Sequence, residues 1–254
     1  MPEYTFNTTL PLTLDVSIPA GEIDVETVEG DQSTVEVTGD ESLLENVEVR
    51  HDGDRLVVAL RGKSKFGFVV QFGSHVFGNA GLRVRAHVPQ GSGLRVKTTS
   101  ADTQLAGQFG ALELNSTSGD LHLRGDVAGN ATVKTVSGDV GLERVAGDLT
   151  VQCVSGDIRA RSVSGSVDTK SVSGDIRVEA VTAGDVHFSS VSGDIEIGIA
   201  SGSLLDVDAG STSGDLSSEV PLATEPPAGE EAAAPTVILR GRTVSGDLRV
   251  FRAA

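Results

Sequence analysis

Residues 132–140 read TVKTVSGDV, residues 150–158 read TVQCVSGDI, and the Val-Ser-Gly-Asp motif in both returns at 172–175, 191–194 and 244–247. Related triplets, Ser-Ala-Asp at 100–102 and Ser-Gly-Asp at 118–120 and 213–215, extend the series. Neighbouring aspartates are 18 or 19 residues apart up to Asp194, and the last two steps are 21 and 32 residues. Repeats of a nearly fixed length predict a solenoid. The motif aspartates, which we expect at structural corners, are Asp102, Asp120, Asp139, Asp157, Asp175, Asp194, Asp215 and Asp247.

Weaker corner signals lie halfway between these motifs, for example at Asn130, Asp148 and Ser166. Each half-repeat therefore has a corner of Gly, Ser and Asp, followed by the alternating residues that are typical of a half-buried strand. Such strands bury their apolar faces only when successive coils stack. The sequence thus predicts an all-β fold, a parallel β-solenoid (β-helix or β-roll-like) with about 18–19 residues per coil.

The core of this solenoid should be narrow and aliphatic. The chain has no Trp, one Tyr and only 4% aromatic residues. Its 31 glycines among 254 residues exceed the usual share of about 7% and suit frequent corners. Phe188 is the one ring that we find among the inward positions.

In-register stacking also predicts which outward side chains become neighbours. Arg124, Glu143, Arg161 and Glu179 each follow a motif aspartate by four positions. Opposite charges would then alternate up one face of the solenoid and attract one another weakly.

The sequence divides the chain into two regions. Residues 1–90 lack the motif but keep the strand alternation, and we expect an N-terminal β-strand region or cap that is continuous with the solenoid. Whether this region is a cap or a separate domain stays open. Residues 91–254 form the repeat solenoid, interrupted by a proline-rich loop excursion at 221–235.

Half of the eight phenylalanines fall within residues 65–78. Two interpretations are open for this segment. It could be a hydrophobic plug on the end of the solenoid, or an exposed patch that contacts a partner, a second copy of the chain or a membrane surface. The residues of this candidate interface are Phe66, Phe68, Phe72 and Phe77.

The formal charge of −16 opposes binding to nucleic acid, because phosphate recognition requires basic surfaces. No stretch has the roughly 20 apolar residues of a membrane-spanning helix, and the N-terminus does not resemble a signal peptide. We therefore expect a cytoplasmic protein. The lone Cys153 forms no internal disulfide and stands where other repeats have Thr135, Ser171 or Ser190, which favours a small corner residue over a nucleophile.

No motif of the sequence indicates catalysis. The chain has no Walker sequence, G-x-S-x-G or paired cysteines, and its histidines lack metal-ligand spacing. The sequence predicts no enzyme, no cofactor and no metal site. The dispersed histidines are His51, His75, His87, His122 and His187.

The repeated aspartates favour a structural role, in which each side chain accepts a hydrogen bond from a corner N–H group. One alternative is a calcium-binding β-roll, although the repeat lacks the GGxGxDxUx pattern of such proteins. Another is a carbohydrate-binding or carbohydrate-active β-helix, for which Glu113, Asp168 and Asp206 are outward-facing carboxylates of one predicted sheet.

The serial Val-Ser-Gly-Asp units, together with PAGEIDVETVEG at 19–30, resemble the bacterial putative-adhesin family of β-strand-repeat domains of unknown function. The resemblance spans most of the chain. It implies a β-solenoid, a non-catalytic role and an association with the cell envelope, and it carries no catalytic residues. We therefore expect a structural or interaction protein that presents its repeat faces to a macromolecular partner, and self-association through an end or the Phe-rich segment is one form of such contact.

Overall fold

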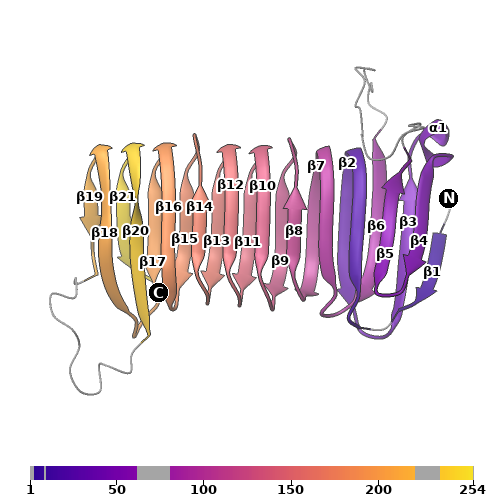
Figure 1. Cartoon of the computed structure of the whole chain (residues 1–254), viewed down its shortest axis with the longest axis horizontal. Coiled ribbons are helices and arrows are strands. Elements are labelled where there is room, and N and C mark those ends of the chain that lie inside the picture. The colour runs from indigo at the N-terminus through magenta and orange to yellow at the C-terminus, as the bar shows by residue number, and fades with distance from the viewer. Residues whose placement is uncertain (1–2, 9, 62–80, 221–234, 254) are drawn as a thin grey trace.

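The computed structural model describes residues 3–8, 10–61, 81–220 and 235–253. These residues form one continuous sheet of 21 strands, stacked along a single long axis, and a short helix, α1 (Glu41–Leu44) (Figure 1). The strands are β1 (Glu3–Asn7), β2 (Thr13–Val28), β3 (Gln32–Thr38), β4 (Val47–Asp52), β5 (Arg55–Leu60), β6 (Leu82–Pro89), β7 (Gly93–Phe109), β8 (Leu112–Asn115), β9 (Leu121–Val127), β10 (Ala131–Ser137), β11 (Val140–Val145), β12 (Leu149–Ser155), β13 (Ile158–Val163), β14 (Val167–Lys170), β15 (Ile176–Val181), β16 (Gly184–Ser192), β17 (Ile195–Ile199), β18 (Leu204–Ser213), β19 (Leu216–Ser218), β20 (Thr236–Ser245) and β21 (Leu248–Arg252).

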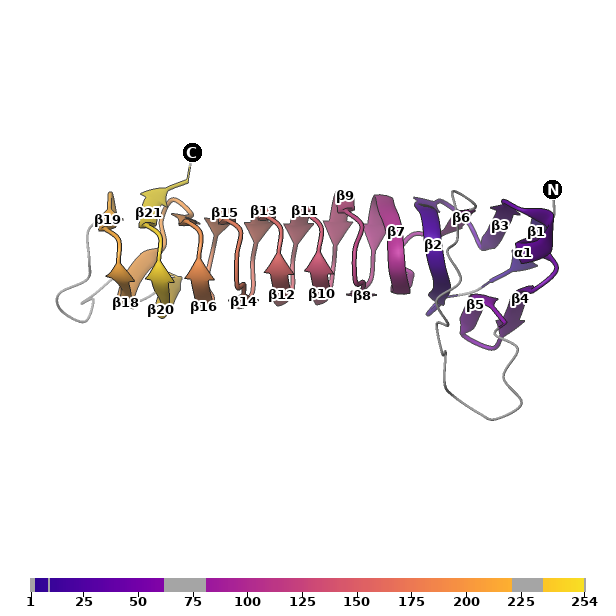
Figure 2. The same ribbon diagram turned by 90° about the horizontal axis from the view of Figure 1, so that it is seen from above.

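Each central coil contributes one strand to each of two layers, which Figure 2 shows on either side of the narrow molecule. One layer contains β8, β10, β12, β14 and β16, and the other contains β9, β11, β13, β15 and β17. Strands of neighbouring coils pair in parallel and in register, as Ile158 does with Ile176. This arrangement confirms the predicted parallel β-solenoid and its coil length.

The core lies between the two layers and consists almost entirely of aliphatic side chains. Ile158 and Ile176 are fully buried, whereas Arg159 and Arg177 on the same strands face outward and are exposed. Phe188 is buried at its predicted inward position, and Phe109 is a second buried ring at a position that the predicted alternation did not include. Phe109 is the last residue of β7. It lies beyond the alternating positions that follow a corner, and its side chain also points into the core.

Near its ends the solenoid departs from the order of the chain. β20 lies between β16 and β18, and β21 lies between β17 and β19. β2 likewise lies between β7 on one side and β5 and β6 on the other. The 32-residue step in the sequence thus reflects a last coil that is inserted between the two coils that precede it in the chain. Because these strands have neighbours on both sides, they are protected from the fraying that chain ends often show.

Antiparallel strands are found at the N-terminal end of the molecule. β3 pairs with β1 and β6, and β4 pairs with β5, all in antiparallel orientation. Since β6 pairs in parallel with β2, the N-terminal strands belong to the same sheet as the repeats. These antiparallel pairs end the parallel stack on that side (Figure 2).

The predicted row of alternating charges keeps its register from Glu143 to Glu179 but not at its start, where a β-bulge places both Arg124 and Gly125 opposite Glu143. Glu143 lies opposite Arg161, since Leu142 pairs with Ala160 and Arg144 with Ser162. In the described part of the chain, none of the ion pairs joins two members of this row.

Within the described ranges, no helix could cross a membrane, because α1 has only four residues.

Candidate functional site

The motif aspartates form a continuous ladder along one long corner of the solenoid, which we call the motif corner. Up to Asp247, the Oδ1 atom of each aspartate accepts a hydrogen bond from the backbone N–H of the aspartate in the next coil, over 2.8–3.0 Å. Asp247 stands between Asp194 and Asp215 in this ladder, as the inserted coil requires. The carboxylates therefore act as acceptors that tie one coil to the next. The ladder runs through Asp102, Asp120, Asp139, Asp157, Asp175, Asp194, Asp247 and Asp215.

From Asp120 onward, the glycine that precedes each motif aspartate allows the coils to approach closely, whereas Ala101 precedes Asp102. Gly156 has a φ of 130°, which side-chain-bearing residues rarely adopt. A Cβ atom at this position would also lie 2.3 Å from the carbonyl oxygen of Gly138 in the preceding coil. Both the backbone angle and the contact with the preceding coil therefore require glycine.

The opposite corner of the coil is built with a more varied set of side chains. There the N–H of Asp148 donates to Asn130 Oδ1, and the N–H of Ser166 donates to Asp148 Oδ1, both over 2.9 Å. The N–H of Asp185 donates to Ser166 Oγ over 3.3 Å. The exposed residue after the last inward position is small at this corner, namely Ala128, Ala146, Ser164 or Thr182.

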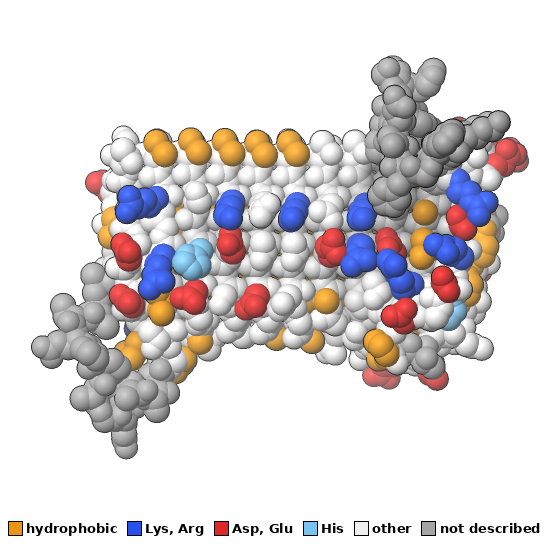
Figure 3. Space-filling model, in the orientation of Figure 1, with side chains coloured by type: hydrophobic (Ala, Val, Ile, Leu, Met, Phe, Trp, Pro, Cys, Tyr) orange, Lys and Arg blue, Asp and Glu red, His pale blue; other side chains and the backbone are white. Residues whose placement is uncertain are grey.

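At the motif corner, by contrast, valines occupy the exposed position after the last inward residue in five coils. They follow one another in register, because the flanking serines of successive coils are paired, Ser155 with Ser173, Ser173 with Ser192 and Ser192 with Ser245. Figure 3 shows the resulting line of hydrophobic side chains along one long edge of the molecule. This valine ladder consists of Val136 (47% exposed), Val154 (45%), Val172 (48%), Val191 (49%) and Val244 (53%).

A shallow groove of about 690 Å³ follows the valine ladder on the side of β10, β12 and β14. Its walls differ in chemistry, since the valines form one side and polar side chains of the sheet form the other. Buried small residues of the strand ends lie between them. The lining residues are Val136, Val154, Val172 and Val191 on the apolar side, Asn115, Lys134, Gln152, Lys170 and Ser189 on the polar side, and Ser116, Thr135, Cys153 and Ser171 between them.

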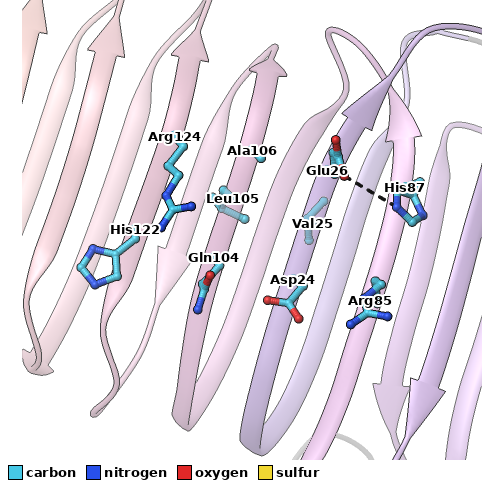
Figure 4. Close-up of a pocket in the computed structure, with 10 residues that line it drawn as sticks. All are labelled: Asp24, Val25, Glu26, Arg85, His87, Gln104, Leu105, Ala106, His122 and Arg124. Atoms are coloured by element: carbon cyan, nitrogen blue, oxygen red, sulfur yellow. Dashed lines mark ion pairs between the residues drawn. The ribbon is translucent and has the colours of Figure 1, made fainter.

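A second, smaller pocket of about 170 Å³ lies on the other layer, where β2, β6, β7 and β9 meet (Figure 4). The Nε2 atom of His87 lies 3.8 Å from a carboxylate oxygen of Glu26, and its Nδ1 atom lies 3.1 Å from Thr34 Oγ1. Arg85, Asp24 and other polar side chains surround this pair. None of the lining residues is a Ser, Cys, Thr or Lys, so the pocket offers no hydroxyl, thiol or amine nucleophile.

The structure does not bring together the three carboxylates that the sequence singled out for carbohydrate chemistry. Glu113 and Asp168 occupy one row of the sheet, but three coils separate them, which corresponds to about 14 Å. Asp206 lies in another row, opposite Ile238. A hydrogen bond from Arg95 lowers the pKa of Glu113, whereas a general acid requires a raised pKa.

Cys153 occupies the same row as Thr135, directly opposite it in register. The Thr135 hydroxyl donates to the carbonyl of Ser137 over 2.9 Å, and the thiol lies 3.8 Å from the carbonyl of Gly156. Burial raises the pKa of the Cys153 thiol, which keeps it protonated and unreactive at neutral pH.

Metal binding finds no support in the described part of the chain, where no group of three His, Cys, Asp or Glu side chains could hold an ion. The candidate interface residues Phe66, Phe68, Phe72 and Phe77 lie outside the described residues, as does the excursion at 221–234.

Sequence reasoning missed the valine ladder. The signal was present, because the motif itself begins with a valine just before the corner. Strand alternation would assign Val136 to the outside, since Val133 and Thr135 point inward. An outward apolar residue repeated in five coils is the pattern that could have revealed this surface.

Comparisons with known proteins agree with this architecture. The family model described as Toastrack DUF4097 matches residues 13–250. A crystal structure of a putative adhesin from Parabacteroides distasonis superposes with a TM-score of 0.59 at 14% identity, covering 98% of this chain and 96% of that one. A putative adhesin from Bacteroides fragilis gives 0.56 at 13% identity, with the same coverage of 98% and 96%. No curated protein matches the sequence.

Proposed function

Since the chain belongs to the Toastrack DUF4097 family, we propose that it is a non-catalytic interaction protein that binds a macromolecular partner along the valine ladder. The solved neighbours carry the name putative adhesin, which agrees with a role in binding rather than in catalysis. On this proposal the partner is a component of the cell envelope.

The observation that carries the proposal is the difference in exposed side chains between the two corners. Both corners need a glycine and an acceptor for the N–H group of the next coil, and both have them. The opposite corner meets these needs with Ala128, Ala146 and Ser164 on its outside. Exposed valines are therefore not required to build a corner, and a continuous apolar line is a common mark of a binding surface.

The residues that occupy the valine position in the coils on either side of the ladder also support a surface role. Thr117 lies at the same position in the coil before Val136, and Thr212 lies at that position beyond Val244. The valines are thus confined to five neighbouring coils, and the threonines at either end show that the fold accepts a hydroxyl there.

The test is co-sedimentation with isolated bacterial cell envelopes. We compare the wild-type protein with a four-threonine variant, Val136→Thr, Val154→Thr, Val172→Thr and Val191→Thr. Each substitution replaces a methyl group by a hydroxyl, and the loss of several buried methyl contacts should weaken envelope binding at least about tenfold.

The matched control places threonine at the opposite corner, as Ala128→Thr, Ala146→Thr and Ser164→Thr. Thr182 already occupies that corner, so the fold should accept the change. The control should bind like the wild type. Equal binding by all three proteins would refute the proposed function.

Two alternatives lead to different experiments. A calcium-binding β-roll would gain thermal stability in millimolar calcium, whereas we expect no shift because each Oδ1 atom of the ladder interior already accepts an N–H bond. A carbohydrate-active β-helix would hydrolyse a glycan and lose this activity in Asp168→Asn. The separation of the carboxylates argues against that chemistry.

A further inference from the structure

Beside the valine ladder runs a row of cations with a regular spacing of its own. In register across the sheet, Lys97 pairs with Asn115, Asn115 with Lys134, and Lys134 with Gln152. The row continues through Lys170, Ser189 and Arg242. A cation therefore stands in every second coil, and a neutral polar residue stands between each two. We call Lys97, Lys134, Lys170 and Arg242 the basic row.

The spacing of the basic row follows from the stacking of strands. Neighbouring strands are about 4.8 Å apart, so cations in alternate coils are about 9.6 Å apart and the four together span about 29 Å. Lys97, Lys134, Lys170 and Arg242 are all exposed. Figure 3 shows basic side chains in a line that runs parallel to the hydrophobic edge.

Few of these charges are neutralised by neighbours. Among the described ion pairs, only one involves the basic row, from Lys170 to Asp168 over 3.8 Å. Glu113, on the same strand as Asn115, is paired with Arg95 over 2.8 Å. In a chain of net charge −16, a row of largely unpaired cations indicates an anionic ligand.

Resting on the function proposed above, we propose that the groove between the valine ladder and the basic row binds a linear acidic polysaccharide with one negative charge per disaccharide. An extended disaccharide has about the length of two coils, so its carboxylates would meet successive cations. The Asn115 and Gln152 side chains between the cations can bond sugar hydroxyl groups. The valines would pack against the C–H face of the rings.

The shape of the surface favours a linear ligand over a globular one. The groove is only three residue rows wide but several coils long. A stable contact with a folded protein buries about 1,200–2,000 Å² in a broad patch, which this strip does not offer. A flat anionic membrane would also approach the aspartate ladder just beyond the valines, where like charges repel it.

The proposal is tested with an octasaccharide of hyaluronan, which carries one carboxylate per disaccharide, by calorimetric titration at low salt. We expect binding that weakens as salt is raised, because exposed charge contacts are screened. The variant Lys134→Gln, Lys170→Gln should bind about tenfold more weakly, because it removes two exposed charge contacts whose energies add. The matched control Arg124→Gln, Arg161→Gln removes two cations from the other layer and should bind normally.

Several results would overturn the proposal. Equal binding of a neutral dextran of the same length would show that charge spacing is irrelevant. Binding to vesicles of anionic phospholipid, without binding to hyaluronan, would identify a membrane surface instead. Dimerisation through the valines, seen by light scattering and abolished in the four-threonine variant, would identify a second copy of the chain.

Failure of this inference can be told apart from failure of the proposed function. If hyaluronan does not bind but the four-threonine variant loses envelope binding, the ligand class is wrong and the binding surface stands. If envelope binding is unaffected as well, both proposals are wrong.

Discussion

The two corners of each coil solve the same structural problem with different side chains. At the motif corner, every acceptor is an aspartate, and the exposed residue after the last inward position is a valine in five coils. At the opposite corner, Asn130, Asp148 and Ser166 share the acceptor role, and the exposed residue after the last inward position is Ala, Ser or Thr. The comparison separates what the fold requires, a glycine and an acceptor, from what it does not. The valines fall in the second group.

The largest expected effect concerns the corner glycines. Gly156→Ala at the motif corner adds a Cβ atom 2.3 Å from the Gly138 carbonyl oxygen and keeps a φ of 130° that alanine avoids. We expect a loss of about 3 kcal/mol in the free energy of unfolding, measured by urea denaturation. Gly147→Ala at the opposite corner meets the Gly129 carbonyl carbon at 2.6 Å but has no positive φ, so its loss should be smaller. The reverse order would break the comparison.

A smaller effect is expected from the acceptor side chains. Asp139→Ala removes the acceptor for the N–H of Asp157 and should cost about 1 kcal/mol of unfolding free energy. Asp139→Asn should be nearly neutral, because an amide oxygen fills this role in Asn130 and its neutrality reduces repulsion along the ladder. A large loss in the asparagine variant would show that the motif corner needs the charge itself. Both values come from the same urea titrations.

The buried thiol at the motif corner should be replaceable and unreactive. Cys153→Ser places a hydroxyl where Thr135 and Ser190 donate to carbonyl oxygens over 2.9 and 3.1 Å, so we expect a change below about 1 kcal/mol. Because burial raises its pKa, native Cys153 should react with iodoacetamide far more slowly at pH 8 than the urea-unfolded chain does. Equal alkylation rates would mean that this corner opens readily.

The smallest effect on stability is expected from the exposed valines. Substitutions at exposed positions usually change the free energy of unfolding by less than about 0.5 kcal/mol. The four-threonine variant should therefore unfold close to the wild-type urea midpoint. Cooperative loss of several kcal/mol would show that the valine ladder stabilises the fold, and the contrast between the corners would then lose its functional meaning.

Much of this fold could be predicted from the repeat alone. The glycine and aspartate spacing gives the coil length, and alternation assigns residues such as Ile176 and Arg177 to the inside and the outside. The insertion of β20 and β21 could not be predicted, because it depends on which neighbour a strand selects rather than on its own pattern. Phe109 was missed because its strand continues past the regular alternation.

The candidate site was less accessible to sequence reasoning. The sequence did favour a structural role for the aspartates, whose Oδ1 atoms bond the next coil, but it did not point to the surface beside them. The groove depends on two rows that lie side by side only when coils stack, and each row takes a single residue from each coil. Lys134 and Lys170 are 36 residues apart in sequence and appear unrelated until the register aligns them.

The central claim is that the valine ladder binds a partner and does not support the fold. Its most direct test is the affinity of the four-threonine variant for cell envelopes, measured by co-sedimentation on protein that unfolds at the wild-type midpoint. The account predicts binding at least about tenfold weaker than that of the wild type and of the opposite-corner control. Unchanged affinity in a correctly folded variant would contradict it.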